Sequence, residues 1–305
     1  MNTGFDGTGA SALRRHAPDV ADAIDALVAL NPPTTGEPLA ALARATCATA
    51  LSLPPLPVPD TGEFDAATLS DGGRAALEFA EQMSVDVSAI DDPMRSVLFA
   101  ALADRSAAFV TSVYVADWTP RLRRVLDQLF GAGEDGWSAP AHWNESPTDT
   151  WPLVDAFITR VAGLGELDPV TSEVVRLRAA RQHNCRICKS LRNRSALAAG
   201  ADESTFDEID DHASSAALSD RHKAALALVD AMVWQPGFID DEVIDAIRVH
   251  FSPAQAVELV VTMMRNATNK IAVATGADAA NVSDGVEIYE INRDGSMAFG
   301  LTDPR

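Results

Sequence analysis

Apolar residues recur at helical spacing along most of this 305-residue chain, and strand-like alternation is almost absent before its last part. Ser252-Pro253-Ala254-Gln255 is a capping box with proline at the first helical position, and it opens a long helix. Other helical patterns cover residues 19–30, 39–51, 69–83, 93–102, 106–130, 218–232 and 240–250. We therefore predict an all-α fold.

Three segments interrupt this helical pattern. Residues 1–15 are rich in Gly, Ser and Thr, and we expect them to be loose. The proline-rich stretch 53–60 cannot form the interior of a helix. Residues 131–150 combine Gly, Pro, Trp and acidic side chains, which is typical of a linker.

The end of the chain differs in kind from the rest. Residues 286–291 alternate with period two, Asn292 to Gly295 is a turn signal, and Met297 to Leu301 follows it. This pattern predicts a short C-terminal β-hairpin in residues 278–305. Such a hairpin would cover the mouth of a site or a subunit interface, and the sequence does not choose between the two.

The chain also repeats itself. The pattern Leu-Ser-Asp-x-x-x-Ala-Ala-Leu at Leu69 returns at Leu218, and Met83 and Met232 keep the same offset of 149 residues. Such self-similarity indicates a tandem duplication whose halves pack as a pseudo-twofold pair. We therefore divide the chain into a repeat over 1–130, a linker over 131–150, a second repeat over 151–277 and the tail.

The upstream part of the repeat is weaker and suggests that the first copy has lost its site. Thr35 and Glu37 match Thr171 and Glu173, and Cys47 lies near the position of Cys185. Ala50 stands where the second cysteine would be. We expect the first copy to be an inactive scaffold and Cys47 to be an inert buried thiol.

Composition and charge exclude several classes of function. With 47% hydrophobic and 22% charged residues, the chain resembles an ordinary soluble globular protein. Its formal charge of -20 argues against nucleic acid or an anionic membrane as a partner. The first twenty residues lack the apolar core of a secretory signal, and the longest apolar runs look too short to span a bilayer. Three cysteines do not make a disulfide framework, so we expect a cytoplasmic protein.

Cys185 and Cys188 form a Cys-x-x-Cys motif inside a strongly basic stretch. From Arg176 to Arg194 there are seven basic residues and no acidic one. Nearby cations lower a cysteine pKa from its free value of about 8.5 and so favour the reactive thiolate. We interpret the cluster as the electrostatics of a thiol site.

Local signals place these thiols at a junction of two helices. Asp168-Pro169 opens a helix that ends near His183, and Asn184 can cap a second helix with Cys185 in its first turn. Glu173 on the first helix can approach the thiols across the helix pair, where a buried carboxylate is a candidate proton acceptor. Alternatively, Glu173 is a structural carboxylate paired with Arg176 or Arg178.

Other roles of these residues stay open. His183 is a proton shuttle or a helix-terminal histidine that bonds the last carbonyls. Arg192 holds a thiolate or anchors an acidic substrate, but it is no acid or base near neutral pH. A structural zinc site needs two further ligands at suitable spacing; His183 and His222 exist, but no second Cys or His pair does. A thioredoxin-type fold needs βαβ units, and almost no strand pattern precedes the tail. A redox-active dithiol in a helical fold is the third interpretation, and the family spacing described next supports it.

The spacing from Glu173 through Cys185 and Cys188 to Ala199-Gly200 resembles the AhpD alkylhydroperoxidase and carboxymuconolactone decarboxylase family. The resemblance covers roughly residues 150–277, and further matching positions downstream are Phe251-Ser252, Glu258-Leu259-Val260, Asn266 and Asn269-Lys270. Thiol-active members usually carry a histidine where Arg192 stands, and the AhpD proteins proper have another in place of Ile187. A proton relay here must therefore be shorter or run through water.

The resemblance implies two AhpD-like helical repeats and a thiol-dependent peroxidase or disulfide reductase. It favours Cys188 as the attacking cysteine and Cys185 as the resolving one, whereas helix position favours Cys185 as the thiol of lower pKa. Glu173 would be the proton acceptor, modulated by His183 or Arg192. The resemblance implies no metal, flavin or haem, a lipoyl-type or other small dithiol as reductant, and a homo-oligomer, which we expect to be a dimer or trimer.

Two alternatives remain. Carboxymuconolactone decarboxylases share the fold and act on an acidic lactone without a redox dithiol, so the chain could be a lyase on an acidic small molecule. With one copy decayed and the histidines replaced, it could also be a non-catalytic relative whose thiols sense oxidation.

Overall fold

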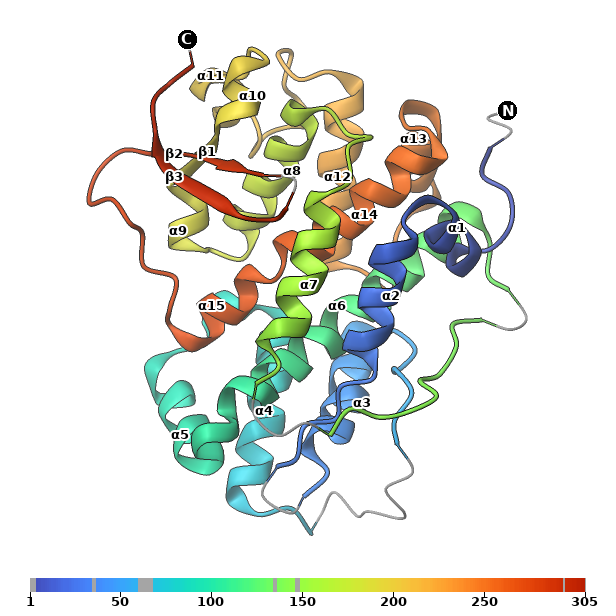
Figure 1. Ribbon diagram of the computed structural model, residues 1–305, viewed down its shortest axis with the longest axis vertical. Helices are drawn as coiled ribbons and strands as arrows, with labels where there is room; N and C mark the ends of the chain where they lie inside the picture. Colours follow the sequence, from blue (N-terminus) through green and yellow to red (C-terminus); the bar gives the residue numbers. More distant parts are fainter. Residues whose placement is uncertain are drawn as a thin grey trace.

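The computed structural model confirms a mainly helical protein with a short C-terminal β-hairpin (Figure 1). It describes residues 4–34, 37–59, 68–133, 136–145, 149–292 and 294–304. Thr35 of the predicted repeat, Asp60 of the proline-rich stretch and Arg293 of the predicted turn lie outside these residues.

The first part of the chain forms six α-helices, which follow the predicted pattern closely. They are α1 Gly9–His16, α2 Pro18–Val28, α3 Leu39–Leu51, α4 Asp71–Val85, α5 Asp92–Leu102 and α6 Ser106–Phe130. The helix α1 corrects the expectation that residues 1–15 are loose. Thr8 and Ser11 form a capping box, and Leu13 is buried where α1 packs against α6.

The second part adds nine helices within the described residues. They are α7 Trp151–Ala162, α8 Pro169–Gln182, α9 Arg186–Lys189, α10 Arg194–Ala198, α11 Glu203–Asp207, α12 Asp220–Trp234, α13 Asp241–His250, α14 Pro253–Asn266 and α15 Asn269–Thr275. Asp168 accepts a hydrogen bond from Thr171 N at the start of α8, and the Ser252–Gln255 capping box starts α14, both as predicted.

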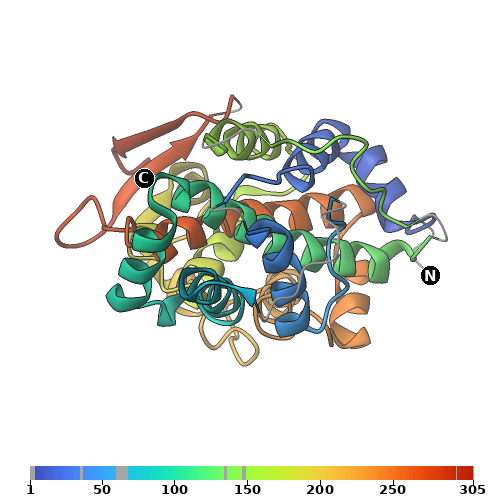
Figure 2. The same ribbon diagram turned by 90° about the horizontal axis from the view of Figure 1, so that it is seen from below.

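The small sheet contains one strand that the sequence did not predict. β2 (Glu287–Ile291) and β3 (Met297–Leu301) form the antiparallel hairpin, while β1 (Leu191–Asn193) pairs in parallel with β2, Leu191 opposite Glu287. The hairpin lies at the edge of the helical body beside α7 (Figure 2). β1 directly follows the Cys-x-x-Cys helix, so the tail is anchored next to the thiols.

Corresponding helices of the two halves pack in the same way. α3 packs against α4 and α6, as α8 packs against α12 and α14, and α4 meets α5 as α12 meets α13. The weaker upstream correspondence differs in the structure. Glu37 precedes α3 and binds Ser70, whereas Glu173 lies within α8; Cys47 lies within α3, whereas Cys185 follows α8. The tandem duplication stays a prediction that rests on the downstream repeat.

The helical stretch Asp92–Phe130 is long and apolar enough to cross a membrane by length and composition, unlike the shorter runs that we expected. Core helices of soluble proteins pass the same test, and half of its most apolar window is buried inside the protein. Its final helix, α6, packs against α1, α3 and α14. The central place of α6 in the fold is reason enough for its apolar sequence.

A buried ionic cluster ties α6 to the second half. Asp117 accepts a bond from Arg121 Nε at 2.8 Å and contacts the Lys270 ammonium of α15. Arg121 also donates to the carbonyls of Met232 and Val233 at the end of α12. All three charged side chains are at most 3% exposed. Because no water reaches them, each charge depends on the others for its stabilisation.

Removing the carboxylate of this cluster should therefore destabilise the protein strongly. We expect Asp117→Asn to lower the free energy of unfolding by about 3–5 kcal/mol, since it leaves two buried cations without a counter-charge. Denaturant unfolding measures the change. Asp22→Asn, which breaks an exposed pair with Arg14, is the matched control and should cost less than about 1 kcal/mol. Equal effects of the two variants would contradict this assignment.

Candidate functional site

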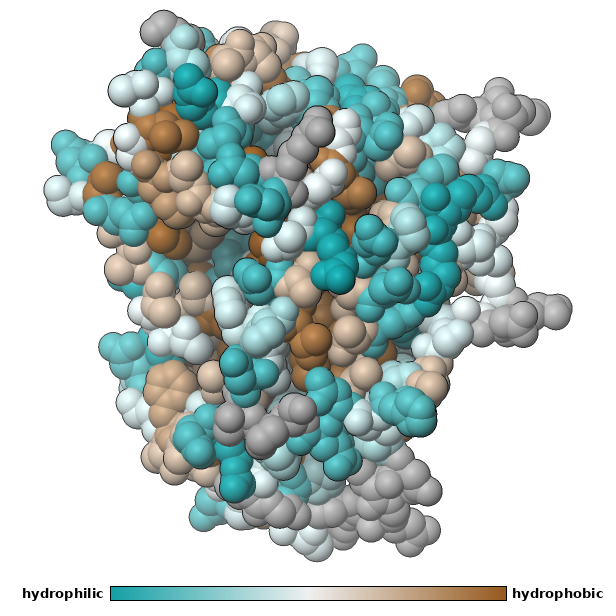
Figure 3. Space-filling model, viewed as in Figure 1, coloured by the Kyte–Doolittle hydropathy of each residue, from teal (hydrophilic) through white to brown (hydrophobic). Residues whose placement is uncertain are grey.

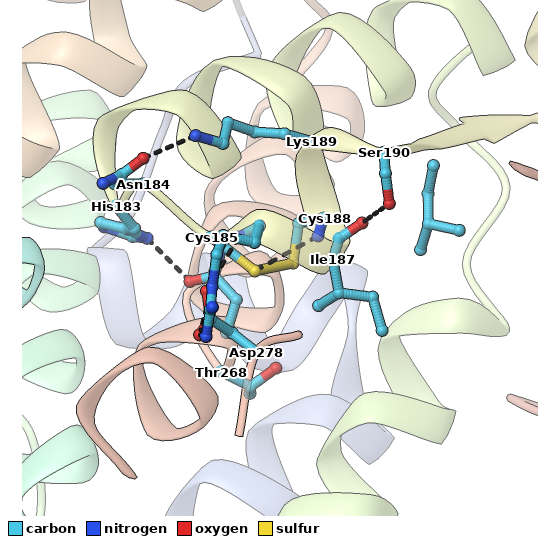
Figure 4. The surroundings of a disulfide bond; sticks show 12 residues. His183, Asn184, Cys185, Ile187, Cys188, Lys189, Ser190, Thr268 and Asp278 are labelled. Carbon is cyan, nitrogen blue, oxygen red and sulfur yellow. Dashed lines mark hydrogen bonds and ion pairs between the residues drawn. A yellow bond between two sulfur atoms is a disulfide. The ribbon is translucent and has the colours of Figure 1, made fainter. Parts of the chain in front are cut away.

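Cys185 and Cys188 form a disulfide at the start of α9, with their Cα atoms 5.3 Å apart (Figure 4). Cys185 is itself the N-cap of α9, where we had placed it in the first helical turn after an Asn184 cap. Its Sγ accepts a hydrogen bond from Cys188 N at 3.3 Å. Asn184 takes a left-handed backbone with φ of 54°, which turns the chain sharply between α8 and α9. Cys185 is fully buried, and Cys188 is partly buried.

Asp278, from the segment after α15, fixes the position of the disulfide helix. Its carboxylate accepts the backbone N–H of Arg186 at 2.9 Å and pairs with the Arg186 guanidinium, and its carbonyl accepts the N–H of Ile187. Burial raises the pKa of Asp278, but the bonds from Arg186 outweigh it and the pKa is lowered overall. The carboxylate is therefore ionised where it meets the start of α9.

Glu173 and Arg176 form a two-pronged ion pair behind the thiols. Arg176 Nε and Nη2 each lie 2.7 Å from a different Glu173 oxygen, and Glu173 is only 1% exposed. Arg176 also donates to the carbonyls of Cys188 and Leu191, and Glu173 accepts the N–H of Asn193. This is the pairing that the structural interpretation of Glu173 expected. Its role as a proton acceptor stays a prediction.

The basic stretch is largely neutralised in the structure, which corrects its interpretation as site electrostatics. Arg178 pairs with Asp230 and Asp210, Arg181 with Asp210, Arg186 with Asp278, and Arg192 with Glu203. The acidic partners lie outside the basic stretch, from 11 positions away for Glu203 to 92 for Asp278, so the pattern of the stretch itself could not reveal them. Most of these cations hold the polypeptide together around the thiols.

Arg192 lies in this scaffold. Its guanidinium binds both oxygens of Glu203 at 2.8 and 2.9 Å, donates to the carbonyls of Lys189 and Leu191, and stacks over Phe206. With these donors engaged, Arg192 braces the chain between α9 and α11.

His183 is buried beside the edge of Trp118, and its Nδ1 lies 2.8 Å from Asn269 Oδ1. Its pKa is well below the ordinary value because burial disfavours the imidazolium and Lys270 repels it. Asn269 lines a cavity beside the thiols, so His183 positions a cavity residue through this bond.

A cavity of about 370 Å³ opens beside Cys188. Cys188 lines it, and Cys185 does not. Most of its wall is apolar, and the rest is polar or basic. Besides Cys188, the lining residues are Trp151, Ile158, Arg176, Ile187, Leu191, Arg265, Asn266, Thr268, Asn269, Ala272, Tyr289, Ile291 and Met297. Its volume lies within the range of small-molecule sites. In Figure 3, brown and tan apolar residues lie among teal hydrophilic ones over the region of the hairpin. Met297 at the start of β3 is 43% exposed.

Tyr289 of β2 is a cavity residue that sequence reasoning missed. Its hydroxyl lies 3.5 Å from Glu173 Oε2, and its ring lies 5.2 Å from the Arg176 guanidinium carbon. Burial raises the pKa of Tyr289 above its ordinary value although Arg176 opposes this, so the phenol stays protonated. The hairpin therefore contributes to the wall of this cavity, and its role at a subunit interface stays a prediction.

Cys47 differs from the two motif cysteines in its environment. It is fully buried, and burial raises its pKa to about 12. It is thus the inert thiol that the sequence predicted.

The low pKa of His183 makes a testable contribution to stability. The unfolded chain binds a proton at His183 below about pH 6.5, whereas the folded protein does not, so the free energy of unfolding falls as pH drops through this region. The His183 share of that slope is at most about 1.4 kcal/mol per pH unit. We expect His183→Gln to flatten the loss between pH 7 and pH 5. An unchanged slope in denaturant unfolding would contradict the buried neutral imidazole.

The part of the chain that carries Cys185 and Cys188 resembles a known protein family. Residues 153–231 match the model of the carboxymuconolactone decarboxylase family. The chain is 44% identical over 284 residues to Uncharacterized protein Rv2313c of Mycobacterium tuberculosis strain H37Rv and to Uncharacterized protein MT2376 of strain CDC 1551. Each match covers 92% of this chain and 98% of the relative. No solved structure matches.

Proposed function

The chain belongs to the carboxymuconolactone decarboxylase family, and from this premise we propose that it is a thiol-dependent peroxidase that cycles between a dithiol and a Cys185–Cys188 disulfide. The observation that carries the proposal is the cavity beside Cys188, because it gives one sulfur of a bonded pair access to a small molecule while the other stays buried. A disulfide reductase would use the same pair.

Cys188 is the attacking cysteine in this proposal. Its thiolate attacks the outer oxygen of a hydroperoxide, the O–O bond breaks, and the organic part leaves as an alkoxide that takes up a proton to become an alcohol. Cys188 is then a sulfenic acid. The Cys185 thiol attacks the Cys188 sulfur, which closes the disulfide and releases water.

Tyr289 is the proposed proton donor to the departing alkoxide. Tyr289 lines the same cavity as Cys188, and its protonated hydroxyl lies beside Glu173. Glu173 is paired with Arg176, so in this scheme it orients the phenol and takes part in returning its proton from water. This is the shorter relay that the missing family histidines require.

An external dithiol completes the cycle. Its thiolate attacks Cys188 through the cavity, releases Cys185, and then closes its own disulfide as it frees Cys188. Two neighbouring thiols on an apolar carrier, as in a lipoyl group, suit the apolar wall. We further propose that the protein works in the cytoplasm as a homo-oligomer, a dimer or trimer.

Thiol trapping tests the assignment of the two cysteines. One equivalent of cumene hydroperoxide should remove two of the three thiols of the reduced protein, counted after denaturation. Cys185→Ser should accumulate a sulfenic acid at Cys188 that dimedone traps, whereas Cys188→Ser should keep its remaining thiols. Cys47→Ser is the control and should cycle normally. Persistence of all three thiols in the wild type would refute the peroxidase and favour a lyase or a structural role.

The proton donor can be tested separately through the leaving group. We expect Tyr289→Phe to slow Cys188 oxidation by cumene hydroperoxide about 100-fold, because its alkoxide needs a proton as it leaves. A peroxycarboxylic acid loses a stable carboxylate, so its rate should hardly change. Stopped-flow tryptophan fluorescence or timed thiol counts follow both reactions. If both oxidants slow equally, Tyr289 acts on the structure and donates no proton.

A further inference from the structure

Arg265, near the end of α14, is a cation without a counter-charge. Within the described residues, no hydrogen bond or ion pair is found for its guanidinium, and its Nε is buried without a partner. Among the neighbours that carry a charge near neutral pH, Arg176 has the largest effect on Arg265, and it repels the Arg265 guanidinium. Arg265 is thus a partly buried cation without a partner, which is costly, and an anion that arrives from outside would compensate its charge.

The adjacent residue provides a second unsatisfied donor. Asn266 is 9% exposed, and its Nδ2 is buried without a hydrogen-bond partner. Both Arg265 and Asn266 line the cavity of Cys188, and both also line a smaller neighbouring cavity of about 80 Å³ that contains Glu173. Both residues therefore border the space that a ligand in the larger cavity would occupy.

The charge around the larger cavity favours an anion. Its described lining contains two guanidinium groups and no carboxylate. Glu173 neutralises Arg176, which leaves the charge of Arg265 uncompensated. The chain as a whole has a formal charge of -20, so an uncompensated cation at the cavity of Cys188 differs in sign from the protein around it. The rest of the wall, including Trp151, Ile158 and Met297, is apolar.

We propose that this cavity binds a carboxylate on a mainly apolar molecule, with Arg265 and Asn266 as the carboxylate subsite. Resting on the proposed peroxidase function, this names the substrate class as small organic hydroperoxides that carry a carboxylate at the end remote from the peroxide. The guanidinium and the amide hold the acid, the apolar wall holds the body, and the peroxide faces Cys188. Arg265 acts as a specificity-determining residue.

Alkylation of Cys188 tests the subsite without any peroxide. In reduced Cys185→Ser protein, the rate of Cys188 modification by iodoacetate is divided by the rate with neutral iodoacetamide. Any change in the thiolate fraction cancels in this ratio, so it reports the preference for a carboxylate alone. We expect Arg265→Gln to lower the ratio about 10-fold, and Arg265→Lys to retain part of it. Arg160→Gln removes one positive charge at an exposed position and should leave the ratio unaltered.

A matched substrate pair extends the test to turnover. We expect kcat/KM for 4-(2-hydroperoxypropan-2-yl)benzoate to exceed that for its methyl ester about 10-fold, and Arg265→Gln to abolish the difference. Equal ratios in wild type and Arg265→Gln, or equal use of acid and ester, would overturn the carboxylate subsite while the peroxidase stands. If neither peroxide reacts, the peroxidase proposal fails, and the alkylation ratio still decides whether the carboxylate site exists.

Discussion

The structure around the thiols depends on the buried pair of Glu173 and Arg176. One guanidinium binds both carboxylate oxygens and two backbone carbonyls, those of Cys188 and Leu191, while the carboxylate accepts the N–H of Asn193. The pair therefore joins α8, the disulfide helix α9 and β1. Since Glu173 is only 1% exposed and Arg176 only 12% exposed, the loss of either would leave the other without its main counter-charge. The same pair contacts Tyr289. It therefore holds these elements together and also lies beside the proposed proton donor.

The helical part of the fold could be predicted from the sequence because its causes are local. Apolar spacing, proline at first helical positions and the Ser252–Gln255 capping box are all contained within single segments. The failures have equally clear causes. α1 is an eight-residue helix in a stretch whose glycines and serines suggested disorder, and its stability comes from a capping box and from contact with α6. β1 has only three residues, too few to show a period, and exists through pairing with β2.

The candidate site was predictable as far as its motif extended. Cys185, Cys188 and Glu173 were identified from spacing, and the structure brings them into one region. Tyr289 and Arg265 carry no such spacing, because they reach the cavity through tertiary packing of α14 and the hairpin, and Asn266 was noted only as a position that matches the family. The basic cluster misled for the same reason. Its acidic partners lie outside the stretch and meet it only in the folded chain, so most of its apparent surplus charge is internal to the scaffold.

The pairing of β1 with β2 has a consequence for the order in which this protein matures. A chain is synthesised from its N-terminus, so the two cysteines emerge well before Glu287–Ile291. Until that strand docks beside Leu191–Asn193, Cys188 lacks the Tyr289 wall of its cavity. The two cysteines are thus synthesised before the strand that completes the cavity wall beside Cys188. The candidate site is finished only when the tail takes its place.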